Sequence, residues 1–343
     1  IVLTGASSTT DYNAPVLDSL SGDAVAAGGT TTAGGSAITL TGSNFGPAFS
    51  DGSYDGADLV VKYGPSSSQK YTATTCKVIS QTEITCETTA GIGGSLNWQV
   101  SLASSDSSFS TATTAYLVPS VSGFIDGSYT DINGVSGTSK IVASTLGGDK
   151  LVIQGSEFGQ AGHTEVSATY GTDGTGRTAT GCLIETLSNN NRIVICEYIA
   201  GVGGNLKWKI TIGGQISTAS TDTVKYETPA ITSIAGNAVD TPTPTLGGGS
   251  ITLTGTSFGR TSDSTPVVHY GPGGSPDKYL ATDCTITSAQ TEITCTKGPG
   301  MGRDLQWRVT IDSQISDVFT GGATNYNGPN IISFSGVGAS DAS

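Results

Sequence analysis

The residues of this sequence whose types could do chemistry are six cysteines and two histidines. The cysteines are Cys76, Cys86, Cys182, Cys196, Cys284 and Cys295. A zinc site needs four ligands at close spacing, as in paired C-x-x-C motifs, and many redox proteins also use C-x-x-C, but the sequence contains no such motif. The even number of cysteines instead favours structural disulfides, which form in an oxidising, extracellular compartment.

The two histidines give little support to catalysis. His163 lies in an Ala-Gly-His-Thr turn, and His269 stands beside Tyr270 on an expected strand. Neither belongs to a G-x-S-x-G or H-E-x-x-H motif, so we expect isolated histidines. We predict no catalytic, cofactor-binding or metal-binding residue and therefore no enzyme, although a carboxylate pair that only folding assembles stays open.

The elements that position these residues form one module written three times and begun a fourth time. Each copy opens with Pro and a short apolar alternation and continues with a Gly-x-x-Phe-Gly turn, a Tyr-Gly step, two cysteines and a Trp. The openings are 15–20, 119–124, 229–234 and 329–334, and the Phe-Gly turns are 42–46, 155–159 and 255–259. The expected modules are therefore 15–118, 119–228 and 229–328.

The two ends of the sequence are out of phase with these modules. Residues 1–14 resemble the close of the third module, so we interpret them as the terminal strand of a preceding module. Residues 329–343 begin like a module and are interpreted as the first strand of a following one. This arrangement indicates a longer array.

Short apolar alternations bounded by Gly and Asn are typical of strands. In the first module they cover 37–41, 58–63, 76–79, 83–86 and 96–102. With an opening and a closing strand, each module has about seven strands in about 100 residues, which predicts an antiparallel, two-sheet sandwich of immunoglobulin-like type. We expect an all-β chain of tandem sandwiches in a rod-like array.

The repeat also selects a disulfide pairing. One pair in each module joins Cys76 to Cys86, Cys182 to Cys196, and Cys284 to Cys295. Each bridge would contribute ~3 kcal/mol in the chain-entropy model. Each second cysteine is followed twelve residues later by a Trp (Trp98, Trp208 and Trp307), from which we expect a stiff hairpin between them. We interpret these Trp residues as core and not as sugar-stacking platforms.

A glycine loop lies between Cys and Trp in every module, at 91–94, 201–204 and 300–303. A phosphate-binding loop would be followed by a helix, whereas a strand follows here, so we predict a hairpin turn with positive φ. The third module also carries a Pro-rich loop, Thr241, Pro242, Thr243, Pro244 and Thr245. It is either a stiff polyproline turn or a site of O-linked glycosylation at Thr or hydroxylated Pro. The sequence has no Asn-x-Ser/Thr motif for N-linked glycans.

The charge argues against a nucleic-acid partner, and the hydropathy argues against a membrane-spanning helix in this sequence. The net charge is −13 and only 15 residues are Lys or Arg, which argues against nucleic acid. No apolar run reaches the ~18–20 residues that a membrane-spanning helix needs. The acidic cluster from Asp51 to Asp58 has no counterpart in the other modules, so a repeated calcium site is not expected.

Together, the module opening, the Phe-Gly turn, the Tyr-Gly step, the cysteine pair and the glycine loop resemble the IPT/TIG domain, an immunoglobulin-like module of plexins and related receptors. The endings 206–217 and 305–316 resemble most those of extracellular array proteins of protists and algae, whereas 101–105 in the first module departs from them. The resemblance implies an extracellular scaffold or interaction role and transfers no catalytic residue.

The sequence thus leaves three functions in competition. The leading hypothesis is a non-enzymatic extracellular structural protein whose modules form a rod and self-associate into a cell-surface filament or fibrous coat. The second is an adhesin or receptor ectodomain that binds protein or glycan, and it predicts one atypical module with an exposed aromatic patch. The third is a set of spacer modules in a secreted carbohydrate-active enzyme.

Overall fold

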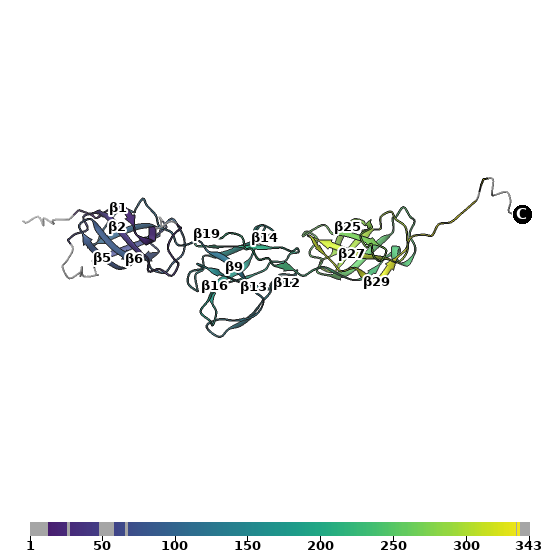
Figure 1. Ribbon diagram of the computed structural model, residues 1–343, viewed down its shortest axis with the longest axis horizontal. Coiled ribbons are helices and arrows are strands. Elements are labelled where there is room, and N and C mark those ends of the chain that lie inside the picture. The colour runs from purple at the N-terminus through teal and green to yellow at the C-terminus, as the bar shows by residue number, and fades with distance from the viewer. Residues whose placement is uncertain (1–12, 26–27, 48–57, 66–67, 334, 337–343) are drawn as a thin grey trace, which may run out of the picture. The chain divides into compact units, whose positions relative to one another are not determined.

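The computed structural model describes residues 13–25, 28–47, 58–65, 68–333 and 335–336, and strands dominate it (Figure 1). The predicted all-β class of tandem sandwiches is confirmed. Most of the acidic cluster between Asp51 and Asp58, and most of the strand expected at 1–14, lie outside the described residues. Among the described residues of 329–343, no strand forms.

The chain divides into two compact units, and the second module contributes to both. One unit consists of Ile1–Ser139, Lys150–Glu197 and Lys207–Asp222. The other consists of Lys140–Asp149, Tyr198–Leu206 and Thr223–Ser343. Each unit is described by itself below.

The first module is a sandwich of two four-stranded sheets. One sheet has the order β1 (Val16–Ser21), β2 (Ala37–Ser43), β6 (Glu83–Glu87), β5 (Thr74–Ser80). The other has the order β4 (Tyr71–Thr72), β3 (Leu59–Gly64), β7 (Asn97–Leu102), β8 (Ser105–Asp106). A short 3-10 turn, Asp23–Val25, follows β1. The alternation of β2 places Ile38 and Leu40 in the core and leaves Thr39 between them less buried, as a one-sided sheet requires.

The prediction of a stiff hairpin between Cys and Trp is wrong. In the first module the second cysteine lies on β6 and Trp98 lies on β7, and these strands belong to different sheets. The glycine loop therefore crosses from one sheet to the other. The sequence misled here because both strands direct apolar side chains into the same core, and such a pattern does not distinguish neighbours in one sheet from strands facing each other across a sandwich.

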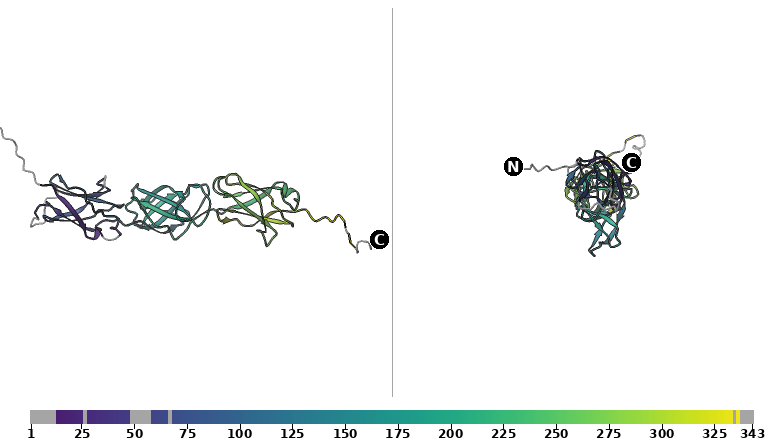
Figure 2. Two further views of the ribbon diagram at one scale, coloured as in Figure 1. Left: turned by 90° about the horizontal axis from the view of Figure 1, so that it is seen from above. Right: turned by 90° about the vertical axis from the view of Figure 1, so that its left-hand side faces the viewer.

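The first unit also contains two sheets of the second module. The larger is built from β9 (Ser120–Ile125), β10 (Gly127–Thr130), β11 (Ser136–Ser139), β13 (Lys150–Ser156), β17 (Arg192–Glu197) and β16 (Thr180–Thr186). The smaller has the order β15 (Arg177–Thr178), β14 (Val166–Gly171), β18 (Lys207–Ile212), β19 (Gln215–Ile216). The β10–β11 hairpin, teal in Figure 2, projects from this module and has no counterpart in the first.

This hairpin explains an irregular apolar pattern. Strand β17 buries Ile193, Val194 and Ile195 in succession, so it is covered on both faces. Tyr129 of the hairpin packs against the cluster that contains Ile193 and Ile195. The second module therefore has an additional small core. The corresponding strands of the other modules, β6 and β26 (Glu292–Thr296), alternate Ile with Thr and so would not support such a core on their second face.

The second unit contains the third module and a short parallel ladder between β12 (Val142–Ala143) and β20 (Lys225–Tyr226). The third module repeats the strand order of the first. One sheet is β21 (Ala230–Ala235), β22 (Ser250–Thr256), β26 (Glu292–Thr296), β25 (Thr282–Ser288). The other is β24 (Tyr279–Leu280), β23 (Val267–Gly271), β27 (Leu305–Ile311), β28 (Gln314–Ile315), with β29 (Phe319–Thr324) also paired to β27. A single helical turn, α1 (Asn237–Asp240), follows β21.

One glycine in each module permits the first strand to approach the second. A Cβ added at Gly255 would overlap the carbonyl oxygen of Ala230 and the ring of Phe258, and Gly42 and Gly155 have the same surroundings. The glycine that opens the Gly-x-x-Phe-Gly motif is therefore a packing requirement.

We expect Gly255→Ala to destabilise the third module by about 1–3 kcal/mol, because the new methyl group forces the first strand away from β22. Differential scanning calorimetry of the whole chain measures the effect. Gly328→Ala is the control. A Cβ added at Gly328 would have nothing within 4 Å, so the free energy of unfolding should change by less than about 0.5 kcal/mol. Equal stability of the two variants would contradict the packing argument.

Candidate functional site

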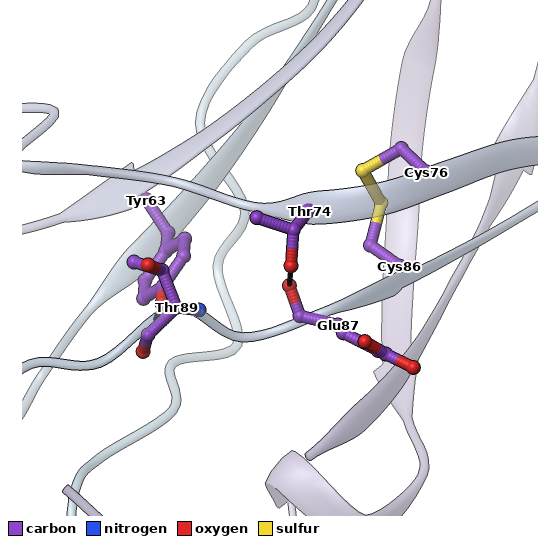
Figure 3. Close-up of a disulfide and its surroundings, with 6 residues drawn as sticks. All are labelled: Tyr63, Thr74, Cys76, Cys86, Glu87 and Thr89. Atoms are coloured by element: carbon purple, nitrogen blue, oxygen red, sulfur yellow. Dashed lines mark hydrogen bonds between the residues drawn. A yellow bond between two sulfur atoms is a disulfide. The ribbon is translucent and has the colours of Figure 1, made fainter. Parts of the chain in front are cut away.

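The cysteines form three disulfides within modules, Cys76 to Cys86, Cys182 to Cys196, and Cys284 to Cys295. Figure 3 shows the first of them, which joins neighbouring strands β5 and β6 of one sheet. The register of these strands shifts between Thr74 and Lys77, and Thr75 adopts a φ of 51°. Each disulfide therefore fastens a β-bulge, and it does not join two sheets as in antibody domains.

The three Trp residues are core residues, as predicted. Trp98, Trp208 and Trp307 are fully buried, and their side chains stack on Tyr63, Tyr170 and Tyr270 with ring centroids 4.1, 4.4 and 4.3 Å apart. A sugar-stacking platform needs an exposed ring face, so these side chains do not provide one.

The histidines lie in unrelated surroundings. Burial, and to a smaller degree the nearby Lys70 ammonium, lower the pKa of His163. His269 lies on β23, opposite Leu280 on one side and Arg308 on the other. Two surface depressions, of 360 and 270 Å³, contain no histidine among their lining residues. In the part of the chain that the structure describes, no three His, Cys, Asp or Glu side chains gather at a metal-binding distance.

The glycine loops have the predicted positive φ. Gly93, Gly203 and Gly302 have φ values of 100°, 106° and 111°, a conformation that side chains with a Cβ rarely adopt. The first position of the loop requires glycine for a different reason. A Cβ at Gly91 would overlap the Tyr71 and Tyr116 rings. Contacts within the same module therefore account for the first glycine of the loop.

In the first unit, the second module packs on this loop. Gly159, the last residue of the Phe-Gly turn, lies so close to Ile92 that a Cβ there would overlap its methyl group. Gln215 Nε2 donates a hydrogen bond to the carbonyl oxygen of Tyr116 at 2.9 Å. Thr32 donates from its N–H and from Oγ1 to Glu157 Oε2, at 2.8 and 2.9 Å.

In the second unit, the third module makes the same contacts on the glycine loop of the second. A Cβ at Gly259 would overlap a methyl group of Val202, the counterpart of Ile92. Gln314 Nε2 donates to the carbonyl oxygen of Tyr226 at 2.9 Å, and Gln314 Oε1 accepts from the N–H of Gly203 at 3.1 Å.

The threonine contact also recurs, with a different partner. Thr145, the counterpart of Thr32, donates from Oγ1 to Gln290 Oε1 at 2.6 Å. The Gln290 amide nitrogen donates in return to the Thr145 carbonyl oxygen at 3.3 Å. We call the recurring set of an apolar loop residue, a threonine, a Phe-Gly turn and a hairpin-tip residue the junction.

Sequence reasoning missed the junction. Its signal was present in the Gln-Ile-Ser endings at 215–217 and 314–316, which the first module replaces with Ser105 at the position of the glutamine. The repeat was visible, but the glutamine's partner is a backbone carbonyl, and a backbone acceptor leaves no mark in the sequence.

The Pro-rich loop, for which O-linked glycosylation was one interpretation, has a mixed environment. Thr243 is buried, and its N–H and Oγ1 both donate to the carbonyl oxygen of Asn325. Thr241, Pro242, Pro244 and Thr245 are exposed. Glycosylation stays a prediction, for which the buried Thr243 is the least accessible acceptor.

The third module also buries a lysine. Lys297 is fully buried, its Nζ donates to the carbonyl oxygen of Asn325 at 2.8 Å, and it lies 3.9 Å from the centroid of the Tyr326 ring. Burial lowers the pKa of Lys297 to about 8. Thr88 and Tyr198 occupy this position in the other modules, so the lysine is particular to the third.

The comparisons with known proteins agree with this fold. Residues 28–116, within the first module, match the model of the IPT/TIG domain. No curated protein matches the sequence. Among the described residues, no helix is long and apolar enough to cross a membrane.

Similar solved structures include the surface glycan-binding protein PbSGBP-B from Prevotella bryantii, at 16% identity over 61% of this chain and 41% of that one, with a TM-score of 0.29. The Escherichia coli adhesin FdeC matches at 15% identity over 92% of this chain and 100% of that one, with a TM-score of 0.24. The plexin A4 extracellular region matches at 15% identity over 90% of this chain, with a TM-score of 0.24, and this chain spans 24% of it. All three scores are below 0.5, so none supports a function.

We expect the stability of the third module to rise with pH because of Lys297. Below pH 8 the amine is protonated in the folded and the unfolded chain. Between about 8 and the ordinary value of 10.5, the folded chain releases the proton while the unfolded chain keeps it, so folding becomes more favourable. Calorimetry from pH 7 to about 9.5 measures this, below the range where the buried tyrosines act in the opposite direction.

Lys297→Met should remove most of this pH dependence, because no ionisable amine is left to titrate. Lys278→Met, at an exposed lysine of the same module, is the control and should keep the wild-type slope. An identical slope in Lys297→Met and the wild type would contradict the assignment.

We expect Gln314→Ala to loosen the junction without unfolding a module. The variant removes the acceptor of the Gly203 N–H, so hydrogen exchange at that amide should accelerate by about tenfold, the equivalent of 1.4 kcal/mol. Exchange at the core strand β27 should not change. Gln306→Ala, on β27 itself, is the control and should leave the Gly203 amide protected.

Proposed function

We propose that this chain is a non-enzymatic, extracellular structural protein whose tandem modules form a stiff array. The observation that carries the proposal is the recurrence of the junction: the glycine loop of one module contacts the Phe-Gly turn and hairpin tip of the next in both units. A flexible linker would need no such set of contacts. Contacts repeated at equivalent positions suit a structural protein that keeps successive modules at a regular distance.

The disulfides support the extracellular part of the proposal. One bridge in every module fastens a bulged pair of strands, and such bridges persist in an oxidising environment. Each small module has a core centred on one Trp–Tyr stack, so a covalent constraint adds stability that its limited apolar area does not supply.

The finer form of the proposal is assembly into a cell-surface filament or fibrous coat. The support for it is the resemblance of the endings at 206–217 and 305–316 to those of protist and algal array proteins. Covalent O-glycans on the exposed Thr or Pro residues of the Pro-rich loop would fit such a coat.

An adhesin or receptor ectodomain is the second candidate, because the second module is atypical. Its β10–β11 hairpin ends in a turn that exposes Ile132 and Val135, with 54% and 63% of their surface accessible. These side chains are aliphatic, whereas the hypothesis predicted an aromatic patch, but exposed apolar side chains at the tip of a projecting hairpin are still suited to a protein partner. A double variant, Ile132→Ser with Val135→Ser, should abolish cell or ligand binding if this candidate is correct.

Electron microscopy of the native material tests the leading proposal. We expect extended particles with a regular axial repeat of about one module. Reduction of the disulfides should reduce the resistance of these particles to heat, because each bridge contributes about 3 kcal/mol to a module. Dispersed particles without a repeat would contradict the proposal.

A further inference from the structure

One polar atom at the junction of the first unit has no partner. The Nε2 atom of His163 is buried, and among the residues that the structure describes nothing forms a hydrogen bond with it. The ring lies against the Phe-Gly turn, since a Cβ added at Gly159 would be 3.3 Å from His163 Cδ2. Ile92 of the first module packs on the same glycine. Buried polar atoms almost always have a partner, so this nitrogen is an exception at a point of contact between modules.

Charged groups from both modules face this histidine. Lys70 belongs to the first module, and its Nζ lies 2.7 Å from Oε1 of Glu165, two residues after the histidine in the second. Arg192 begins β17 of the second module. Burial lowers the pKa of His163 most, and Lys70 lowers it further. Glu165 acts in the opposite direction, and Arg192 again lowers the pKa.

A proton on this imidazole would be unfavourable while the junction is closed. The ring would carry a positive charge with Nε2 buried and without an acceptor, in the field of the Lys70 ammonium. A buried charge that lacks a partner costs free energy, and exposure to water removes that cost. Separation of the Phe-Gly turn from Ile92 would give the ring such exposure. The closed junction therefore favours the neutral imidazole.

The junction of the second unit has an ion pair at the same place. Asp263 is the counterpart of His163, because it also lies four residues after the last glycine of the turn and would contact a Cβ added at Gly259. Arg260 Nη2 lies 2.8 Å from Asp263 Oδ1 and donates to the carbonyl oxygen of Ala200, in the preceding module, at 3.3 Å. Carboxylates and guanidinium groups in general keep their charges between pH 5.5 and 7.5, whereas histidine in general titrates there.

We propose that His163 makes the junction between the first and second modules sensitive to pH. This junction is closed when the imidazole is neutral and loosens when the imidazole is protonated, while the junction between the second and third modules keeps its strength. The response is a property of the contact itself. Its use, as a hinge that acid releases in an otherwise stiff array, rests on the proposed structural function.

The direction of the effect follows from where the proton binds. Above the ordinary histidine pKa of 6.5, the ring is neutral whether the junction is closed or open, so the contact has its full strength. Below that value the open junction, in which water reaches the ring, takes up a proton more readily than the closed one. Opening therefore becomes more favourable as the pH falls. At pH 5.5, one unit lower, this equilibrium can have shifted by about tenfold at most.

Hydrogen exchange of the full chain, resolved by residue, tests the proposal between pH 7.5 and 5.5. The probe of the first junction is the N–H of Thr32, which donates to Glu157 Oε2 across it. The reference in the same molecule is the N–H of Gly203, which donates to Gln314 Oε1 across the second junction. After correction for the intrinsic pH dependence of exchange, protection at Thr32 should fall by about threefold to tenfold, and protection at Gly203 should stay constant.

Variants at the histidine show whether it is the group that titrates. His163→Gln should give constant protection at Thr32, because the amide does not ionise in this range. His269→Gln, at the other histidine, is the matched control and should keep the wild-type response. The double variant Gln160→Arg with His163→Asp installs the ion pair of the second junction and should also make protection at Thr32 independent of pH.

A core amide separates loosening of the junction from unfolding of the module. The N–H of Ile210 donates to Ser217 Oγ at 2.9 Å, and Ile210 is fully buried in the second module. Its protection should not change between pH 7.5 and 5.5. A fall at Ile210 as large as the fall at Thr32 would mean that the whole module loses stability, which would overturn the proposal.

Three further outcomes would overturn it: constant protection at Thr32 in the wild type, an equal fall at Gly203, or an unchanged response in His163→Gln. None of these would contradict the structural function, because both junctions would then hold or respond alike. Conversely, native material without an axial repeat, combined with the expected exchange, would contradict the proposed function and leave the pH response of the junction standing.

Discussion

The interaction on which the rest of the structure depends is the stack of a buried Trp on the tyrosine of the Tyr-Gly step. In the first module, Tyr63 stacks on Trp98, and its hydroxyl lies 2.7 Å from that of Tyr116. Tyr116 donates to the Thr89 carbonyl oxygen, at the start of the glycine loop. In the third module, Tyr270 stacks on Trp307 and pairs with Tyr326 in the same way. Since a buried hydroxyl needs a partner, the core determines the position of the loop that meets the next module.

This arrangement explains how one chain combines two similar junctions with a second module that carries an additional hairpin. The loop and the tyrosines lie at the connection between the two sheets, whereas the β10–β11 hairpin pairs with the chain at the edge of one sheet. Changes at a sheet edge need not disturb the stack. The hairpin packs the half-buried Tyr129 against an additional apolar cluster and leaves the Tyr170–Trp208 stack intact. An addition at a sheet edge therefore changes the surface of a module without changing its Trp–Tyr stack.

Much of the fold could be read from the repeat. The strand alternations placed Ile38 and Leu40 in the core, the large area of a single Trp predicted its burial, and one cysteine pair per module predicted the three bridges. The sequence could not predict that the chain crosses between sheets from Cys86 to Trp98. An apolar alternation with a period of two specifies which face of a strand is buried, but not to which sheet the strand belongs. The continuous apolar run at 193–195 did signal a strand covered on both faces, but not what covers it.

The sequence by itself determined the module, its period, its disulfides and its sandwich class, because these follow from local alternation, turn residues and symmetry among copies. Only the tertiary structure decided the function of the glycine loops. Their conformation is local, but their contacts with the next module are not. Those contacts involve the Tyr116 carbonyl oxygen, which accepts a hydrogen bond, and Ile92, which packs against Gly159. A glycine with positive φ looks the same in the sequence whether it turns a hairpin or makes room for a neighbour, and only packing separates the two.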